Sequence, residues 1–260
     1  MTNQEFIAKN KDADVQALAL GNQPKGIDLH FCLVQIAGLQ TVRKKVPSIA
    51  QKEGILFPKK LSLEQCSSEQ TALYKQQLTE RLLPMKRAKM ADLTGGFGID
   101  FFFLAKLFEE AHYVERENYL CLVAQHNTSI LGFRHVKIHN LTSEEFLDEM
   151  GNFDFIYLDP SHGPLVMVKL SPMLDIKDAI RRLPEVHEVH VVSVDGECKE
   201  VLLVLCKQRQ DITYYCVNLT TRNQLFHTDK PNADPIIASH LEHYLYEPNA
   251  SILKAGVQNA

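Results

Sequence analysis

Apolar positions near the start of the chain recur at the spacing of an α-helix. Between residues 31 and 46, Leu33 and Ile36 begin a stripe of residues three or four positions apart, and Pro47 ends it. A second stretch with helical spacing covers residues 67–83. Both patterns predict helices with one apolar face.

The second of these helices has a recognisable start. Ser67 or Ser68 can act as the N-cap, and Glu69 and Gln70 then lie in the first turn. We therefore expect residues 1–85 to form a mostly helical N-terminal domain.

From residue 86 onward, short apolar runs alternate with helical patterns. Strands are predicted over 88–94, 111–115, 135–140, 153–160, 165–173, 186–195 and 199–207, and helices over 99–111, 118–131, 143–150 and 176–183. This alternation is typical of βαβ units and predicts a doubly wound α/β domain, with a mostly parallel sheet covered on both faces. We assign this domain to residues 86–222 and a C-terminal extension to residues 223–260.

One connection in this scheme is too short. If the strands over 153–160 and 165–173 were parallel neighbours, the crossover between them would contain little more than residues 160–164. A parallel crossover needs about a dozen residues or more. Either the second strand runs antiparallel, or a segment of the natural chain is missing here, and we favour the second explanation.

The overall charge excludes two classes of protein. The 28 basic and 32 acidic residues leave a net charge of −4, which excludes a basic nucleic-acid coat and an acidic disordered chain. The balance is uneven, because residues 1–90 carry 14 basic and 8 acidic residues, or +6. This basic part could steer a polyanion, although a solvated basic face is the alternative.

Other features of the composition place the protein in the cytoplasm. No apolar run reaches the ~18 residues of a membrane span, and the first 16 residues lack the apolar core of a signal peptide. The six cysteines include no C-x-x-C pair, and the 11 histidines form no metal-binding pattern. We expect neither a membrane association nor a metal site.

The strongest local motif is a glycine-rich turn between a predicted strand and a predicted helix. It runs from Asp92 to Gly98, and its glycines allow a tight turn and close approach of a ligand. A helix start after such a turn offers free N–H groups to an anionic group. Nucleotide-binding folds place an acid ~20 residues further on, where it binds ribose hydroxyls. Glu115 is that acid, 23 residues after Asp92.

The spacing of the glycines separates two classes of cofactor. A dinucleotide site has the pattern G-x-G-x-x-G, but here the third position is Phe101. This argues against a nicotinamide oxidoreductase. The pattern D-x-x-x-G-x-G instead resembles motif I of class I S-adenosylmethionine-dependent methyltransferases.

The resemblance to these methyltransferases implies which residues bind S-adenosylmethionine. In that family the turn lies against the methionine part of the cofactor, and the acid after the second strand holds the ribose. The candidate residues are Asp92, Thr94, Gly95, Gly96, Gly98, Glu115 and, after the third strand, Asn140. Ser67 and Glu69 are further candidates, because a similar helix start often closes over the carboxylate end of the cofactor, but helix capping explains them equally well.

A second motif follows the apolar run at residues 153–158. Asp159 and Pro160 resemble motif IV of the same superfamily, where an acid or amide and a backbone carbonyl accept hydrogen bonds from the amine to be methylated. That arrangement catalyses mainly by orienting the nitrogen lone pair. The sequence here is D-P-S-H, without the aromatic residue that would stack on a flipped base.

An ordered set of segments narrows the resemblance further. The chain is similar to Bacteroidetes-type class I methyltransferases with a THUMP-like C-terminal domain, over 66–75, 91–100, 113–121, 166–175, 195–205 and 244–256. In these relatives the D-P motif is followed by a longer charged segment, and the chain continues into the THUMP-like part. The resemblance implies an RNA substrate and a truncated C-terminal extension.

The sequence as a whole therefore predicts a class I methyltransferase that transfers a methyl group to RNA, at an exocyclic base amine. Two alternatives stay open. One is a methyltransferase that acts on protein or on a small molecule, which the missing aromatic residue favours. The other is a module that binds S-adenosylmethionine and RNA without turnover.

Overall fold

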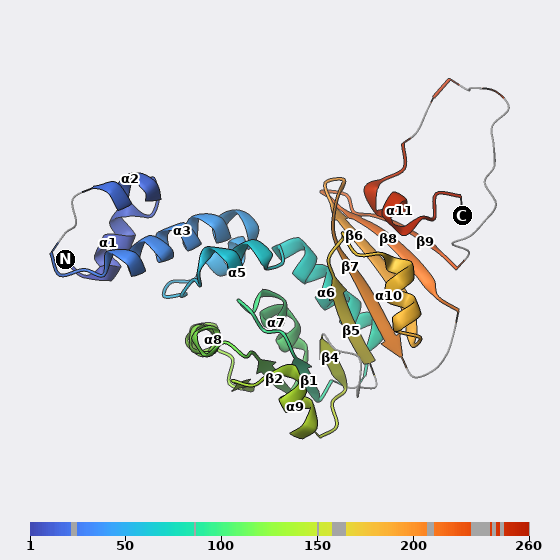
Figure 1. The fold of residues 1–260 in the computed structure, drawn as a ribbon, viewed down its shortest axis with the longest axis horizontal. Coiled ribbons are helices and arrows are strands. Elements are labelled where there is room, and N and C mark those ends of the chain that lie inside the picture. The colour runs from blue at the N-terminus through green and yellow to red at the C-terminus, as the bar shows by residue number, and fades with distance from the viewer. Residues whose placement is uncertain are drawn as a thin grey trace. The chain divides into compact units, whose positions relative to one another are not determined.

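The computed structural model describes residues 1–21, 25–85, 87–149, 151–157, 165–206, 211–229, 240, 243–244 and 247–259. The chain divides into two compact units, Met1–Met150 and Gly151–Ala260 (Figure 1). The first unit holds an N-terminal set of helices and three strands, and the second holds a mixed sheet with two short helices.

The N-terminal part of the first unit is helical, as predicted. Its helices are α1 (Asn3–Asn10), α2 (Val15–Leu20), α3 (Leu29–Lys45), α4 (Pro47–Ala50), α5 (Lys60–Gln65) and α6 (Glu69–Leu82). Helices α1 and α2 pack against α3. The side chains of Phe6, Cys32 and Ile36 form the buried centre of this packing.

Helix caps explain the short helices that apolar spacing does not single out. Thr2 and Glu5 form a reciprocal capping box at the start of α1, and Asp14 accepts hydrogen bonds from the first turn of α2. Asp28 caps α3, which therefore begins two residues before the predicted helix at 31.

Three parallel strands follow in the first unit, in the order β3-β2-β1. They are β1 (Lys89–Asp92), β2 (Glu110–Val114) and β3 (Val136–His139). Helix α7 (Ile99–Leu104) with the 3₁₀ turn η1 (Ala105–Leu107) connects β1 to β2, and α8 (Asn118–Ile130) connects β2 to β3. Helix α9 (Ser143–Glu149) follows β3. This order is that of one half of a doubly wound fold.

The predicted helix over 99–111 is wrong in its last four residues, 108–111. The backbone N–H groups of Glu109 and Glu110 bond to the carbonyls of Arg87 and Ala88 at 3.1 and 2.8 Å. These residues therefore join the sheet, and the chain must leave the helix before them. The apolar residues of this stretch belong partly to the helix and partly to the approach to β2.

An extended segment links the N-terminal helices to α8. Gln35 of α3 exchanges two hydrogen bonds with the backbone of Phe57, each 2.9 Å long. Asn127 of α8 exchanges two with Leu56, each 2.8 Å long. Both amide side chains are buried and pair with backbone as a neighbouring strand would. The helical part and the strands thus belong to one packed unit.

The sheet of the second unit has the order β4-β5-β7-β6-β8-β9. Its strands are β4 (Phe155–Tyr157), β5 (Leu165–Leu170), β6 (Val186–Val194), β7 (Glu197–Cys206), β8 (Thr213–Leu219) and β9 (Gln224–Thr228). Helix α10 (Ile176–Arg182) lies between β5 and β6 in the chain, and α11 (Ala250–Ala255) packs on β6, β7 and β8.

The expectation of a mostly parallel sheet is wrong for this unit. The pairs β5/β7, β6/β7 and β8/β9 are antiparallel, while β4/β5 and β6/β8 are parallel. The cause is local, because Asp195 and Gly196 join β6 and β7 through a tight turn with φ of +48° and +82°. A two-residue turn of this kind produces an antiparallel hairpin.

The connection between β4 and β5 is as short in the structure as the sequence indicated. The two strands pair in parallel, with Ile156 opposite Val166, so the antiparallel alternative is wrong. Seven residues, 158–164, separate Tyr157 from Leu165, fewer than a parallel crossover normally requires. These seven residues lie outside the described part of the chain.

Within the described residues, none of the helices has the length and apolar character needed to cross a membrane.

Candidate cofactor-binding site

The glycine-rich turn begins where β1 ends at Asp92 and leads into α7. Gly96 and Gly98 have φ of +55° and +87°, a region that side chains with a Cβ rarely adopt. The turn is closed by a hydrogen bond of 2.8 Å from the Gly98 amide to the Gly95 carbonyl. The sequence motif therefore forms the strand–turn–helix geometry that it predicted.

Gly95 is the residue with the least room in this turn. A Cβ added there would lie 2.2 Å from the ring of Tyr113. The hydroxyl of Tyr113 donates a 2.5 Å hydrogen bond to the Gly96 carbonyl, and burial raises its pKa, so it remains a neutral donor. Phe101 stands at the position of the third glycine of a dinucleotide motif, and it packs edge-on against the ring of Tyr113.

Gly96 faces a different environment. Among the described residues, a Cβ added there would contact only the carbonyl of Thr94, at 3.8 Å. The turn is therefore crowded at Gly95 and open at Gly96. An open glycine lets a ligand approach the backbone directly.

The acid after β2 lies against this turn, as the spacing of the two motifs predicts. One carboxylate oxygen of Glu115 accepts a hydrogen bond of 2.9 Å from the Gly96 amide, and the other accepts one of 2.9 Å from the Glu117 amide. Each carboxylate oxygen can accept a second bond. The partly exposed carboxylate therefore retains acceptor capacity for ligand hydroxyls.

Three further candidates, Asp92, Thr94 and Asn140, form hydrogen bonds at the ends of the strands. The buried side chain of Asp92 accepts a hydrogen bond of 2.9 Å from the Thr94 amide, which fixes the start of the turn. The exposed amide of Asn140 donates to the carbonyls of Glu115 and Arg116 at 3.0 and 2.9 Å. Asn140 thus holds the backbone that carries the Glu115 carboxylate.

The two candidates at the start of α6 lie in different places. Ser68 is the N-cap, and its hydroxyl accepts from the Thr71 amide. Ser67 instead donates a 2.7 Å hydrogen bond to Asp100 at the start of α7, next to the turn. Glu69 accepts a hydrogen bond of 3.0 Å from the Ser48 amide of α4.

A charged residue that the sequence analysis missed lies beside Ser67. The ammonium of Lys75 has no exposed surface and lies 3.0 Å from the Asp100 carboxylate and 3.1 Å from the Ser67 hydroxyl. Its signal in the sequence is a lysine three positions from both Ala72 and Leu78, on the apolar face of the helix. The helices that carry the pair, α6 and α7, lie side by side (Figure 1).

The predicted catalytic residues, Asp159 and Pro160, lie outside the described residues. For the part of the chain that is described, the structure contains no group of three or more His, Cys, Asp or Glu side chains able to hold a metal ion.

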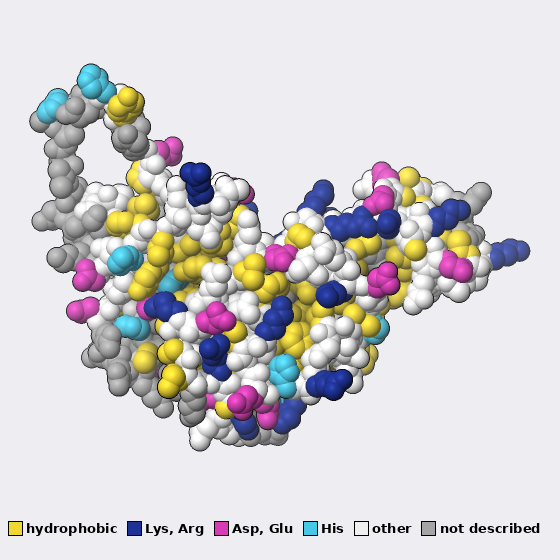
Figure 2. Space-filling model, turned by 180° about the vertical axis from the view of Figure 1, so that it is seen from behind, with side chains coloured by type: hydrophobic (Ala, Val, Ile, Leu, Met, Phe, Trp, Pro, Cys, Tyr) yellow, Lys and Arg dark blue, Asp and Glu magenta, His cyan; other side chains and the backbone are white. Residues whose placement is uncertain are grey.

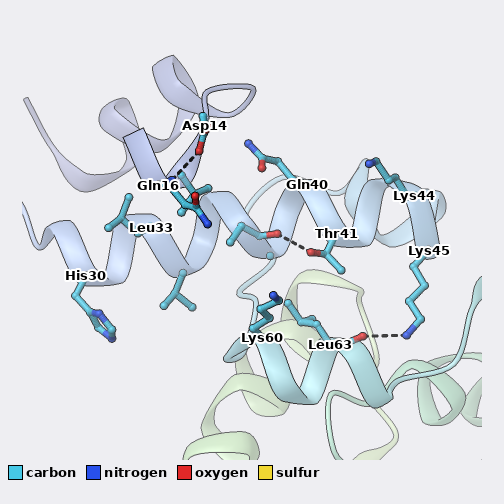
Figure 3. A pocket seen from close by; sticks show the side chains of 14 residues that line it. Asp14, Gln16, His30, Leu33, Gln40, Thr41, Lys44, Lys45, Lys60 and Leu63 are labelled. Carbon is cyan, nitrogen blue, oxygen red and sulfur yellow. Dashed lines mark hydrogen bonds between the residues drawn. The ribbon is translucent and has the colours of Figure 1, made fainter. Parts of the chain in front are cut away.

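A groove of about 1010 Å³ lies elsewhere in the first unit, along α3. Its lining combines apolar residues with lysines: Asp14, Val15, Gln16, His30, Leu33, Val34, Ala37, Gly38, Gln40, Thr41, Lys44, Lys45, Lys60 and Leu63. The ammonium of Lys45 reaches from α3 to the carbonyl of Leu63 in α5 (Figure 3). Lys60 lies 3.5 Å from Glu64 but is mostly exposed.

Charges of both signs occur on the face drawn in Figure 2, where Lys and Arg side chains lie among Asp and Glu. Three of the basic residues in the first 90 positions, Lys44, Lys45 and Lys60, line the α3 groove.

Comparison with known proteins identifies the class of fold. No protein-family model and no curated protein sequence matches the chain. A solved structure described as a candidate methyltransferase from Porphyromonas gingivalis W83 is similar over 98% of this chain and 72% of its own, with a TM-score of 0.80 and 26% identity. A weaker likeness, with a TM-score of 0.45 and 15% identity, is to a candidate RNA methyltransferase from Pyrococcus horikoshii, over 65% of this chain and 98% of that one.

The architecture is thus the Rossmann-like fold of class I methyltransferases, with an N-terminal helical part. The glycine turn and its paired acid occupy the end of the first strands, where ligands bind in open α/β sheets.

Proposed function

We propose that this protein is an S-adenosylmethionine-dependent methyltransferase that methylates an exocyclic amine of an RNA base. The observation that carries the proposal is the glycine turn, which is open at Gly96 and bonded to the carboxylate of Glu115, within a class I methyltransferase fold. A turn with free approach to its backbone and an acid with spare acceptor capacity suits a nucleoside with ribose hydroxyls.

The residues of the turn divide the binding of S-adenosylmethionine between them. Asp92, Thr94 and the glycines would hold the methionine part, and Glu115 would accept hydrogen bonds from the ribose hydroxyls. Asn140 would act by holding the backbone behind Glu115, through the hydrogen bonds described above. When bound, the cofactor supplies a methyl group on a positively charged sulfur.

The transfer step needs little general acid–base catalysis. The amine nitrogen would form a bond to the methyl carbon as the carbon–sulfur bond breaks, the sulfur would become neutral, and the amine would release its proton to solvent. Asp159 and the backbone at Pro160 would accept hydrogen bonds from the amine and align its lone pair, which is catalysis by orientation. These roles rest on the resemblance to motif IV.

An RNA acceptor is supported by charge and by resemblance. The first 90 residues carry a net charge of +6, and Lys44, Lys45 and Lys60 line the groove along α3. Phosphate groups bind such lysines with a strong dependence on salt. The similarity to methyltransferases with a THUMP-like domain points to the same class of substrate, and we assign residues 223–260 to the start of that region. The reaction belongs to the cytoplasm in this proposal.

A specific observation favours a second candidate function. The parallel strands β4 and β5 are separated by only seven residues, which include the whole D-P-S-H sequence. If a segment on the acceptor side is missing, the chain would bind S-adenosylmethionine and RNA without turnover. Binding and transfer must therefore be measured separately.

Transfer of a labelled methyl group distinguishes these functions. The full chain is incubated with methyl-labelled S-adenosylmethionine and either total RNA or total protein, with Asp159→Ala as the matched variant. Label in RNA from the parent chain, lost in Asp159→Ala, is expected. Label in protein alone would refute the RNA acceptor, and cofactor binding without any labelled product would favour the binding module.

The salt dependence of RNA binding tests the groove. The double variant Lys44→Glu/Lys60→Glu removes two candidate phosphate contacts, so the slope of log K against log salt should fall by ~1.4 to ~1.8. Lys52→Glu changes a lysine that does not line the groove and is the control. Equal slopes for all three proteins would contradict an RNA contact at the groove.

A further inference from the structure

A buried charged network joins the start of α6 to the helix that follows the glycine turn. The ammonium of Lys75 contacts both Asp100 and Ser67, at 3.0 and 3.1 Å, and Ser67 donates to the other oxygen of Asp100 at 2.7 Å. Lys75 is fully buried, and the side chain of Asp100 is 11% exposed. The three groups therefore contact one another in a place with little access to water.

Such a network is an expensive way to stabilise a fold. Removing an ammonium and a carboxylate from water costs several kcal/mol per ion, and their attraction repays this only in good geometry. Apolar residues of similar size often stabilise a buried site equally well or better. The packing of α6 on α7 alone therefore does not require a lysine at position 75.

The place of the network in the fold indicates what it fixes. Asp100 is the second residue of α7 and follows Gly98 by two positions. Ser67 precedes Ser68, the N-cap of α6. The network thus ties the segment before α6 to the end of the glycine turn, where Gly98 has little freedom, since a Cβ there would lie 2.9 Å from Phe102.

We propose that Lys75 is a positioning residue that holds the glycine turn in the conformation that binds S-adenosylmethionine. Lys75 acts through Asp100 and Ser67, without touching the cofactor. The proposal rests on the proposed function in so far as the cofactor is S-adenosylmethionine. The geometric part, that Lys75 orders the turn, is independent of the ligand.

The decisive variant removes both charges together. Lys75→Met/Asp100→Leu removes both charges of this pair together, so the chain should fold with a denaturant midpoint close to that of the parent. Its affinity for S-adenosylmethionine should fall at least tenfold. The amides of Gly95, Gly96 and Gly98, which are all hydrogen-bonded in the structure, should exchange with deuterium faster.

A control uses an ion pair whose carboxylate is also buried. Lys169 and Glu200 lie 3.7 Å apart in the second unit, with Glu200 3% and Lys169 24% exposed. The variant Lys169→Met/Glu200→Leu should leave both the affinity for S-adenosylmethionine and the exchange of the turn amides as in the parent. If Lys75→Met/Asp100→Leu fails to fold, Asp100→Asn keeps the shape of the side chain and is measured by the same exchange experiment.

The outcomes separate this proposal from the proposed function. A parent chain that does not bind S-adenosylmethionine refutes the proposed function, while faster exchange of the turn amides in the double variant would still support the role of Lys75. A folded double variant with unchanged affinity and unchanged exchange overturns the proposal and makes the network purely structural. The same holds if Asp100→Asn, used in its place, leaves the exchange unchanged.

Discussion

Two turns of this chain each contain a glycine with positive φ whose amide donates to a side chain. They differ in how exposed that acceptor side chain is. In the first unit, Gly96 has φ of +55° and its amide donates to Glu115 at 2.9 Å. In the second unit, Gly196 has φ of +82° and its amide donates to Asn218 at 2.9 Å. Each acceptor comes from the strand that pairs in parallel with the strand before the turn.

The acceptors differ in how fully they are used. The carbonyl oxygen of Asn218 also accepts from Ser193 at 3.1 Å, and its amide nitrogen donates to Gln224 at 3.1 Å. Asn218 is buried, and both its amide oxygen and its amide nitrogen have partners within the protein. Glu115 is partly exposed, and each of its two carboxylate oxygens accepts one hydrogen bond from the described residues. A glycine with positive φ therefore does not indicate a binding site by itself. A carboxylate beside the turn that can still accept hydrogen bonds does.

The largest expected effect comes from filling the crowded position of the first turn. Gly95→Ala places a Cβ 2.2 Å from the ring of Tyr113, which is itself fixed by its hydrogen bond to Gly96. We expect a loss of about 2–3 kcal/mol in the free energy of unfolding, as for an overpacked core, together with loss of cofactor binding. Urea unfolding and calorimetry measure the two effects. A fully stable variant with normal binding would contradict the crowding.

Exchanging the two acceptors for alanine should produce opposite results. Glu115→Ala removes ribose contacts and should weaken binding of S-adenosylmethionine roughly 10- to 100-fold, the value of one or two charged hydrogen bonds. Asn218→Ala leaves the Gly196 amide without its acceptor and should cost about 1–3 kcal/mol of stability while binding is retained. If Asn218→Ala weakened binding as much as Glu115→Ala, the distinction between the turns would be wrong.

Gly196→Ala tests positive φ without crowding. Among the described residues, no atom would lie within 4 Å of a Cβ at Gly196, so the strain expected is that of the backbone conformation. The expected loss is about 1–2 kcal/mol, with cofactor binding unchanged. Thermal unfolding with and without S-adenosylmethionine measures this. A loss as large as that of Gly95→Ala, where φ is not positive, would show that positive φ at Gly196 costs as much as contact with Tyr113 does at Gly95.

The smallest expected effect is on pH dependence in the first unit. Burial lowers the pKa values of His112 and His139, so the unfolded chain binds more protons and stability should decline as the pH falls below about 6.5. Hydrogen bonds from Lys137 and His112 lower the pKa of Glu110 to about 2, so its contribution is present above pH 4.5 and is lost as the pH falls toward 2.

Denaturant midpoints between pH 8 and pH 4 measure the effect, and His112→Phe/His139→Phe is the comparison variant. The decline near pH 6 should be shallower in this variant. A parent chain that becomes more stable between pH 7 and pH 5 would contradict the assigned direction.

The sequence predicts the features of the fold and the site that depend on residues close together in the chain. The turn between β1 and α7 follows from its glycines, and its acid follows from the distance between Asp92 and Glu115. Helix α6 follows from the spacing of its apolar residues and from a serine cap. These features depend on residues close in the chain or on a short, regular unit of the fold.

The remaining features depend on distant contacts. The Lys75–Asp100 pair forms only when α6 and α7 pack together. The sequence of α6 alone does not predict which residue Lys75 contacts. The hairpin between β6 and β7 has a local signal in Asp195 and Gly196, which the expectation of βαβ units overrode. Strands β8 and β9 and helix α11 were not expected, because polar residues interrupt the apolar spacing over 211–259.

The central claim is that the glycine turn of the first unit binds S-adenosylmethionine. Calorimetric titration of S-adenosylmethionine, and of its demethylated product, into the full chain and its Glu115→Ala and Asn218→Ala variants tests this claim most directly. The account predicts one binding site in the parent and in Asn218→Ala, and strongly weakened binding in Glu115→Ala. A folded parent that binds neither compound, or a Glu115→Ala variant that binds as the parent does, would contradict it.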